Sequence, residues 1–221
     1  MKLLVEALTK FACGLLMVGL LIFLPAGTIA YPYGCLLMGL LFGPMLIAGF
    51  VMLFKSPAFL KKRLDAKEKQ GTQKGVVAVA GLMFIAGFVV AGLDFRFGWS
   101  IMSTWVVVAA SVLFLVAYAL YAEVMRENAY LSRTIKVEEG QTVVDTGMYG
   151  IVRHPMYAVT ILLFLMIPLV LGSWYALIPF AFYPAIIIIR LRDEEKLLTK
   201  ELSGYDEYKK KVKYRIIPFI W

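Results

Sequence analysis

The stretch MYAVTILLFLMIPLVLGSWYALIPFAFYPAIIII, residues 156–189, decides the fold. Its 34 residues carry no charge. As one helix they would extend about 51 Å, well beyond a hydrocarbon core of about 30 Å. Pro168 and Gly172-Ser173 interrupt the stretch near its middle, and Pro179 and Pro184 would bend its second arm. We therefore predict a hairpin of two packed helices whose two ends lie at the same membrane face.

The rest of the chain is also apolar. Of its 221 residues 61% are hydrophobic and only 17% are charged, with a mean hydropathy of +0.79. A soluble helical protein would need polar helix faces, which these segments lack. We predict an all-α, polytopic transmembrane helical bundle with a C-terminal helical hairpin and a cytoplasmic cofactor pocket. A cleaved signal peptide is the alternative for the first span. The expected spans before the hairpin are residues 11–30, 33–54, 76–93 and 99–121, which gives five spans if the hairpin counts as one and six if it counts as two.

Charge placement predicts the orientation. The loop Lys55–Lys74 carries seven Lys/Arg against two acids, and the tail Arg190–Trp221 carries nine against six. The connection Tyr31-Pro32-Tyr33 has no charge. The positive-inside rule therefore places the termini, the large loops and the functional site in the cytoplasm. The basic patches suit anionic lipid headgroups, and nothing resembles a nucleic-acid module.

The polar segments divide the chain into two expected regions. Residues 1–121 would hold the first four spans with a cytoplasmic loop at 55–75, and residues 122–221 would form the functional region. Ser56-Pro57 begins either a short amphipathic surface helix or a solvated linker. Asp94–Trp99 reads as a tight outward turn in which Asp94 and Arg96 pair or cap, and Thr134–Val144 as an extended segment. From Arg190 the tail predicts a helix that breaks at Ser203-Gly204.

The segment GMYGIVRHPMY, residues 147–157, contains the only histidine. The hairpin would bring it beside Arg190 and Glu194, which lie four residues apart on one helix face. Pro155 suits a first helical turn, whose free amides can hold an anion. Three simpler interpretations remain: an ordinary Arg190–Glu194 ion pair, His154 as a cap, and Arg153 as a snorkelling headgroup anchor. One histidine without ligand-spaced cysteines predicts no metal site.

These motifs resemble the isoprenylcysteine carboxyl methyltransferase family and its phospholipid-methyltransferase relatives. The resemblance rests on GMYGIVRHPMY, the EEKLL after the hairpin and the tail YDEYKKKVKYRIIPFI, and it covers residues from about Thr134 onward. It implies an integral membrane enzyme that uses S-adenosyl-L-methionine. It also implies a substrate-binding and catalytic role for Arg190 and a catalytic and cofactor-binding role for Glu194. The family often has histidine at the position of Gln141. The other cofactor-binding residues that it implies are Gln141, Thr142, Val143, Val144, Tyr149, His154, Pro155, Met156 and Tyr157.

The expected reaction is carboxyl O-methylation of an isoprenylcysteine-type lipophilic acid that enters from the bilayer. A carboxylate is already ionised at neutral pH and needs only alignment, whereas an amine acceptor needs a base such as Glu194 or Glu195. Phospholipid amine N-methylation and a sterol-reductase-like enzyme that uses NADPH are the alternatives. Transport is disfavoured because no charge lies in mid-span. Membrane lipids are expected partners, and the sequence leaves the oligomeric state open.

Overall fold

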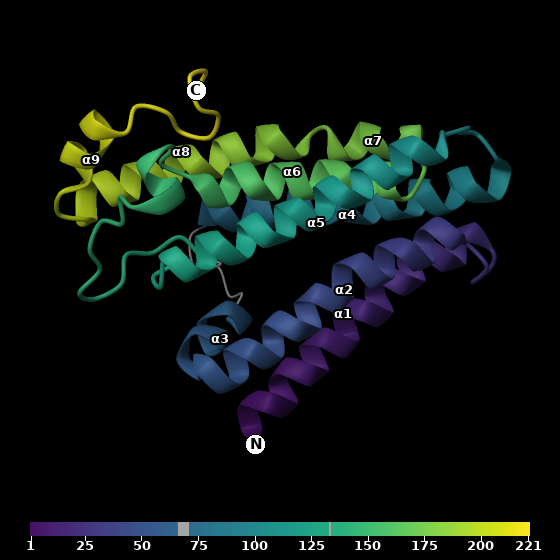
Figure 1. Ribbon diagram of the computed structural model, residues 1–221, viewed down its shortest axis with the longest axis horizontal. Coiled ribbons are helices and arrows are strands. Elements are labelled where there is room, and N and C mark those ends of the chain that lie inside the picture. The colour runs from purple at the N-terminus through teal and green to yellow at the C-terminus, as the bar shows by residue number, and fades with distance from the viewer. Residues whose placement is uncertain (66–70, 133) are drawn as a thin grey trace.

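The protein is a bundle of long helices, seen here in a computed structural model that describes residues 1–65, 71–132 and 134–221 (Figure 1). None of these described residues forms a β-strand, which confirms the all-α prediction. The helices are α1 (Lys2–Ala26), α2 (Pro32–Lys55), α3 (Pro57–Leu64), α4 (Gly71–Phe97), α5 (Thr104–Glu127), the 3-10 helix η1 (Gly147–Gly150), α6 (Pro155–Val170), α7 (Trp174–Phe180), α8 (Tyr183–Glu201) and α9 (Tyr205–Lys211).

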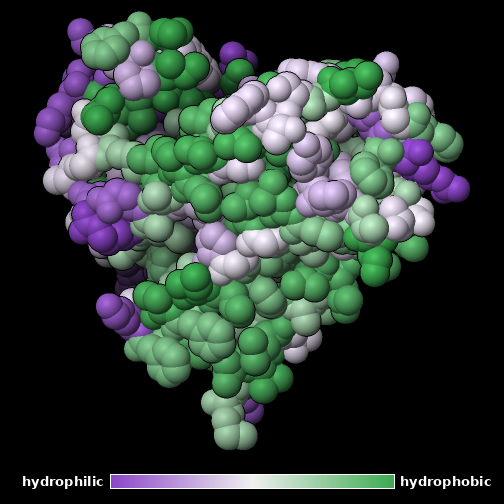
Figure 2. Space-filling view, turned by 45° about the vertical axis from the view of Figure 1, so that its right-hand side comes forward, coloured by the Kyte–Doolittle hydropathy of each residue, from purple (hydrophilic) through white to green (hydrophobic). Residues whose placement is uncertain are grey.

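Five helices among the described residues are long and apolar enough to cross a membrane, with α7 and α8 counted as one. Hydrophobic side chains dominate the face in Figure 2, and hydrophilic ones gather toward its margins. Many large apolar side chains on α1, α2, α4 and α5 are exposed, as expected of surfaces that face lipid. The chain is thus an integral, multi-pass membrane protein.

The hairpin forms as predicted, with its break at Leu171–Ser173. Gly172 has a φ of 71°, a backbone conformation that side chains disfavour. The Ser173 hydroxyl then accepts a hydrogen bond from the Ala176 amide and caps α7. The incoming arm α6 has 16 residues, or about 24 Å, and falls short of a full crossing. It is therefore a shorter apolar helix packed inside the bundle.

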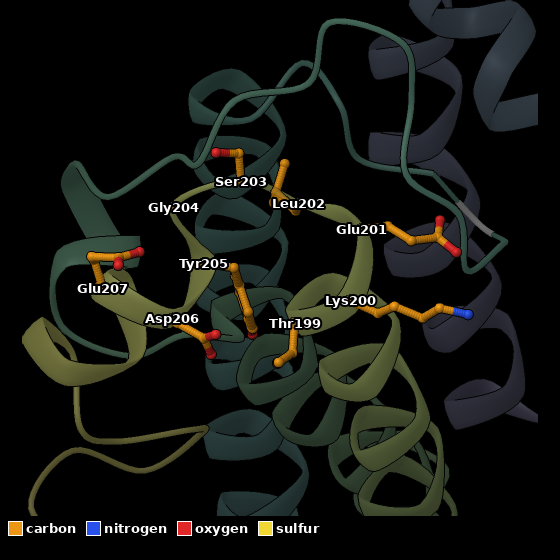
Figure 3. Close-up of a pocket in the computed structure, with 9 residues that line it drawn as sticks. All are labelled: Thr199, Lys200, Glu201, Leu202, Ser203, Gly204, Tyr205, Asp206 and Glu207. Atoms are coloured by element: carbon orange, nitrogen blue, oxygen red, sulfur yellow. The ribbon is translucent and has the colours of Figure 1, made fainter.

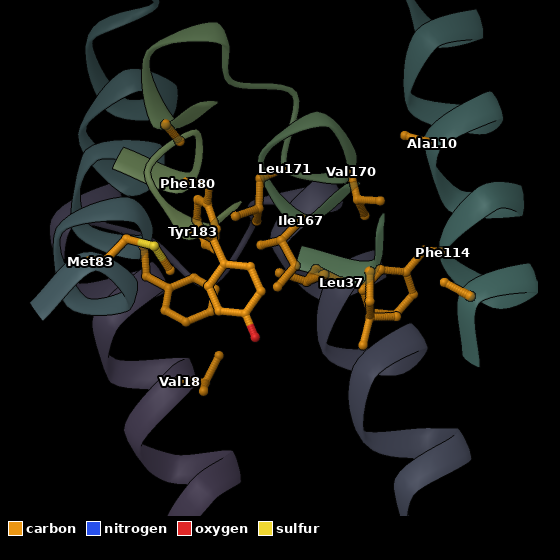
Figure 4. Close-up of a cluster of buried hydrophobic side chains, with 14 of the residues drawn as sticks. Val18, Leu37, Met83, Ala110, Phe114, Ile167, Val170, Leu171, Phe180 and Tyr183 are labelled. Carbon is orange, nitrogen blue, oxygen red and sulfur yellow. The ribbon is translucent and has the colours of Figure 1, made fainter. Parts of the chain in front are cut away.

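The core joins helices from both expected regions. α5 packs most extensively on α6, and α4 packs on both α1 and α7. Figure 4 shows Phe180 and Tyr183 of the hairpin beside Met83 of α4, and Ile167 near Leu37 of α2. Because helices before and after residue 121 share this core, the site at the hairpin ends rests on the whole bundle.

Two expectations about local structure were wrong. The segment 94–99 is not a tight turn, since α4 continues to Phe97. There Asp94 is buried and accepts hydrogen bonds from Ser100 and from the Ser173 hydroxyl, so it joins the α4–α5 connection to the hairpin tip. The helix expected from Arg190 onward is present as the continuation of α8, which runs unbroken from Tyr183 to Glu201. The connection between the first two spans lies before Pro32 and not at Tyr31-Pro32-Tyr33, since α1 ends at Ala26 and α2 begins at Pro32.

Two further expectations were met. Pro57 begins the short helix α3, so this segment is a helix rather than a linker. In this helix Leu60 is buried while the lysines lie toward the surface. The break at Ser203-Gly204 is also present, with a φ of 81° at Gly204 between α8 and α9. The chain therefore turns back at the end of α8 and returns toward the start of α6.

Candidate functional site

Glu195 is the centre of the polar cluster at the hairpin ends. One of its oxygens, Oε1, lies 2.8 Å from Arg153 Nε and 3.3 Å from His154 Nε2. The other oxygen, Oε2, accepts a hydrogen bond of 2.9 Å from Arg215 Nε. The Glu195 side chain is only 12% exposed. The carboxylate thus joins the start of α6, the end of α8 and the tail after α9 into one unit.

The tail completes this unit through its backbone. The Arg153 and His154 amides donate to the carbonyls of Tyr214 and Arg215 at 2.9 and 2.8 Å. The Arg153 guanidinium also donates to the carbonyls of Val212 and Lys213. Arg153 is only 8% exposed, so the snorkelling interpretation was wrong. Its burial follows from the acceptors around it, which satisfy the guanidinium away from water.

His154 occupies the N-cap position of α6, but its side chain makes no capping hydrogen bond. The His154 ring instead stacks on Tyr157 at 5.6 Å and faces Glu195. Pro155 follows at the first helical position, where its missing N–H costs nothing. The sequence order Arg-His-Pro therefore fixes where α6 begins and turns the Arg153 and His154 side chains toward α8.

A second group of contacts surrounds Glu194. The Tyr157 hydroxyl donates to Glu194 Oε2, which links α6 to α8. Arg190, one turn earlier, lies within interaction range of Tyr157 and Tyr183. The structure thus brings His154, Tyr157, Arg190 and Glu194 together, as the hairpin prediction required.

Gln73 is a member of this group that the sequence analysis missed. It is fully buried in the first turn of α4. Its amide donates to Asp193 at 2.9 Å, and its carbonyl lies 3.4 Å from Arg190 Nη1. A glutamine next to a lysine-rich loop gives no sequence signal of its own. Only the packing of α4 against α8 brings it to Arg190.

The segment Gln141–Val144 lies against α9 and is not strand-like. Val143 packs on a small apolar cluster of Leu202, Tyr205, Tyr208 and Val212, while Val144 and Met156 pack on the main core. Gln141 folds back on its own loop, where it bonds the Glu138 backbone, and Thr142 is exposed. Gln141 and Thr142 therefore lie away from the polar cluster, while Val143 borders its α9 side.

Two tyrosines of α9 line the same side and were not among the predicted site residues. The Tyr208 hydroxyl donates to the Tyr149 carbonyl at 2.7 Å and holds η1 against α9. The Tyr205 hydroxyl is buried and has no hydrogen-bond partner among the described residues. Burial raises the pKa of Tyr205 well above its usual range, and the nearby Glu195 and Glu194 add to this effect. Tyr205 therefore keeps its proton and offers an unused donor beside the two carboxylates. The spacing Y-x-x-Y of these residues is the signal that could have found them.

A surface depression of about 370 Å³ lies next to this cluster, at the α8–α9 turn (Figure 3). Its lining includes Tyr205 and Thr199, while Lys200 and Glu201 point away from the other lining side chains. None of the predicted site residues lines it. We therefore place the candidate site at the contacts described above, and the depression marks only its outer edge.

Fold and site define a class: a multi-pass helical membrane protein with a charged, aromatic cluster at the ends of a C-terminal hairpin. Within this chain, residues 107–200 match the isoprenylcysteine carboxyl methyltransferase (ICMT) family. The matched region includes the RHPMY segment, the hairpin and the Glu194-Glu195 pair. The family resemblance inferred from these motifs is thereby confirmed for this region.

Two curated proteins are similar to the same part of the chain. The Delta(14)-sterol reductase TM7SF2 of Mus musculus is 34% identical over 91 residues, which are 40% of this chain and 22% of that protein. The uncharacterized protein YpbQ of Bacillus subtilis (strain 168) is 33% identical over 97 residues, which are 43% of this chain and 58% of that protein. The chain thus covers less than two thirds of either relative.

Proposed function

We propose that the protein is an integral membrane methyltransferase that uses S-adenosyl-L-methionine and esterifies the carboxylate of an isoprenylcysteine-type lipophilic acid. The observation that carries this proposal is the family match over residues 107–200. The family's characteristic segments are also in direct contact, through Glu195 with Arg153 and Glu194 with Tyr157. The lysine and arginine distribution supports a cytoplasmic position for this site.

The residues present suit this cofactor. S-adenosyl-L-methionine, when bound, supplies an electrophilic methyl group on a cationic sulfur. Glu194 would hold a cationic part of the cofactor, because Glu195 is already occupied by its cationic neighbours. The unused Tyr205 hydroxyl would donate to an acceptor on the cofactor. The aromatic faces of Tyr157 and His154 suit a sulfonium or a purine.

Arg190 would bind and aim the substrate carboxylate. Its planar guanidinium can hold a carboxylate through two parallel hydrogen bonds, which fixes the direction of attack. Because the carboxylate is ionised at neutral pH, the reaction requires no base. Partial removal of water and in-line alignment then provide the rate acceleration.

Two other activities are alternatives that the experiment below must distinguish. A phospholipid amine would need to lose a proton first, and Glu194 would be the base nearest to Arg190 on the same helix face. The likeness to TM7SF2, named as a Delta(14)-sterol reductase, favours a reductase with a nicotinamide cofactor as the second candidate.

The test is a labelled-methyl transfer assay on the purified protein in lipid vesicles. A prenylcysteine analogue and phosphatidylethanolamine are offered in parallel, and NADPH oxidation with a sterol is followed separately. We expect label in the methyl ester of the prenylcysteine analogue. Label only in phosphatidylethanolamine would shift the proposal to amine methylation. NADPH oxidation without label transfer would replace it by a reductase.

A further inference from the structure

The segment after α9 folds back along the bundle in a closed loop, Tyr214–Trp221, which we call the tail loop. Its residues Tyr214 and Arg215 accept hydrogen bonds from the amides just before Pro155, the first residue of α6. Figure 1 shows this yellow segment turning back over α8 toward the bundle. The tail loop therefore lies at the level where the apolar helix α6 begins, and we expect the lipid headgroups at the end of such an apolar segment.

The tail loop is held in place by packing against the core and by its own backbone hydrogen bonds. Ile216 is buried, and it packs in the main core together with Trp221. The amides of Ile216 and Ile217 both donate to the Trp221 carbonyl, and the Trp221 amide donates to Ile217 at 3.1 Å. The Arg215 guanidinium lies 5.3 Å over the Trp221 ring. These hydrogen bonds close the backbone of the tail loop, so that only residues 217–220 project outward.

The projecting tip is apolar. Phe219 is 85% exposed and Ile220 is 77% exposed, with Ile217 and Pro218 also at the surface. Phe219 has a φ of 65°, a strained backbone conformation that is uncommon for a bulky residue. The backbone at Phe219 is thus strained, and the phenylalanine projects outward. Exposure of this side chain to water would not offset the strain, whereas its burial in lipid would.

Basic side chains directly precede the tail loop in sequence. Lys210 and Lys213 are exposed and form no ion pair with any residue that the structure describes. Their neighbours differ, since Lys209 pairs with Asp206 and Lys211 pairs with Asp145. Two unpaired lysines in the segment that leads into a protruding apolar loop are the pattern of a segment that inserts its apolar side chains between lipids and places its cations on acidic headgroups.

We propose that the tail loop is a membrane-docking loop: Phe219 and Ile220 insert into the lipid interface, and Lys210 and Lys213 bind anionic headgroups. Arg215 belongs both to this loop and to the Glu195 cluster. Docking would therefore brace the candidate site against the membrane. This inference does not depend on which reaction the site carries out.

The test measures the depth of a spin label in the full-length protein in vesicles. Cys13 and Cys35 are replaced by serine, and a label is attached at Phe219→Cys. The reference labels are at Leu20→Cys, which lies exposed on α1, and at Glu207→Cys, which lies exposed on α9. We expect the Phe219 label to be reached by oxygen, as at Leu20, and to be shielded from a water-soluble nickel chelate that reaches Glu207. Equal access of the chelate to positions 219 and 207 would overturn the insertion.

The lysines are tested by lipid composition. The Phe219 label should move deeper when phosphatidylglycerol is added to phosphatidylcholine vesicles, and this shift should disappear in the Lys210→Gln, Lys213→Gln double variant. A shift of the same size in the double variant would overturn the headgroup contacts. Spin–spin broadening that disappears on dilution with unlabelled protein would show a second copy at the tip and overturn the proposal.

Discussion

Glu194 and Glu195 are neighbours in sequence whose surroundings differ. Glu195 faces Arg153, His154 and Arg215 and is nearly buried, whereas Glu194 accepts a hydrogen bond from the Tyr157 hydroxyl. A carboxylate shared by three donors is a structural element, because removing it leaves the buried Arg153 guanidinium without a compensating charge. Glu194 has acceptor capacity left for a ligand. We therefore propose that Glu195 stabilises the fold and that Glu194 binds the ligand.

A matched pair of variants separates these two roles. Glu195→Gln should destabilise the protein by about 3 kcal/mol, because it removes the charge that faces Arg153 and Arg215. Glu194→Gln should leave stability nearly unchanged, since an amide oxygen still accepts the Tyr157 hydroxyl. It should instead weaken binding of S-adenosyl-L-methionine. Thermal unfolding in detergent and calorimetric titration measure the two effects. An equally stable Glu195→Gln protein would contradict the structural assignment.

Arg190→Ala should reduce turnover of a carboxylate substrate at least about a hundredfold, because an unaligned nucleophile loses most of its advantage. Cofactor affinity should survive, since Arg190 is assigned to the substrate. The control is Arg192→Ala, an exposed arginine on the same helix, which should leave activity unchanged. If Arg190→Ala shows normal turnover at saturating cofactor but weakened cofactor binding, Arg190 binds the cofactor and not the substrate. Methyl transfer at varied substrate and cofactor concentrations distinguishes these results.

At the residue scale the sequence predicted which segments meet, and it could not predict which partner each charge takes. The spacing of Arg190 and Glu194 and the position of His154 were sufficient to expect one site. Arg153 looked like an interfacial anchor because the carbonyls of Val212 and Lys213 that surround it come from a distant loop. Gln73 has no motif at all. Contacts of this kind depend on tertiary packing, which local patterns do not encode.

At the scale of elements, α1 and α4 approach each other closely at Gly92. A methyl group built on Gly92 would lie 2.4 Å from the Ile22 carbonyl oxygen and 3.0 Å from the Ala26 amide nitrogen. These are backbone atoms, which cannot move aside without shifting the helix. Small residues at such crossings let helices in membranes pack closely. The sequence showed glycines throughout these spans, but not which of them lies at a crossing.

Gly92→Ala should therefore destabilise the bundle by about 1–3 kcal/mol, the usual cost of overpacking. The control is Gly81→Ala on the same helix, where an added methyl group meets nothing within 4 Å. This control should be neutral or stabilising by up to about 1 kcal/mol, because alanine favours a helix. Thermal unfolding of both variants in the same detergent is the measurement. Equal effects at the two positions would contradict the close α1–α4 crossing.

At the scale of the whole molecule, α1 and α2 form a pair that diverges from α5 toward the end that carries α3 (Figure 1). Contacts of α3 bridge the two parts at that end. Lys62 pairs with Glu138 in the segment that precedes the candidate site, and Arg63 donates to the Tyr121 hydroxyl of α5. Lys10 of α1 in turn donates to the Leu64 carbonyl at 2.8 Å. The surface helix expected from Ser56-Pro57 thus connects the α1–α2 pair to α5 and to the segment that precedes the candidate site.

This connection should respond to acid. Burial opposes ionisation of Glu138, but its contacts with Lys62 and Lys136 hold the pKa of Glu138 below its ordinary value of 4.5. A lowered pKa in the folded state means that the stabilising contribution is complete above pH 4.5 and is lost as the pH falls through the folded pKa. Amides of α3 should thus keep their protection from hydrogen exchange near neutral pH and lose part of it in acid, after correction for intrinsic exchange rates. In Lys62→Met this protection should already be reduced at neutral pH and should vary less with pH. An acid-dependent loss as large in Lys62→Met as in the wild type would assign the change to another group and leave α3 held by Arg63 and Tyr121.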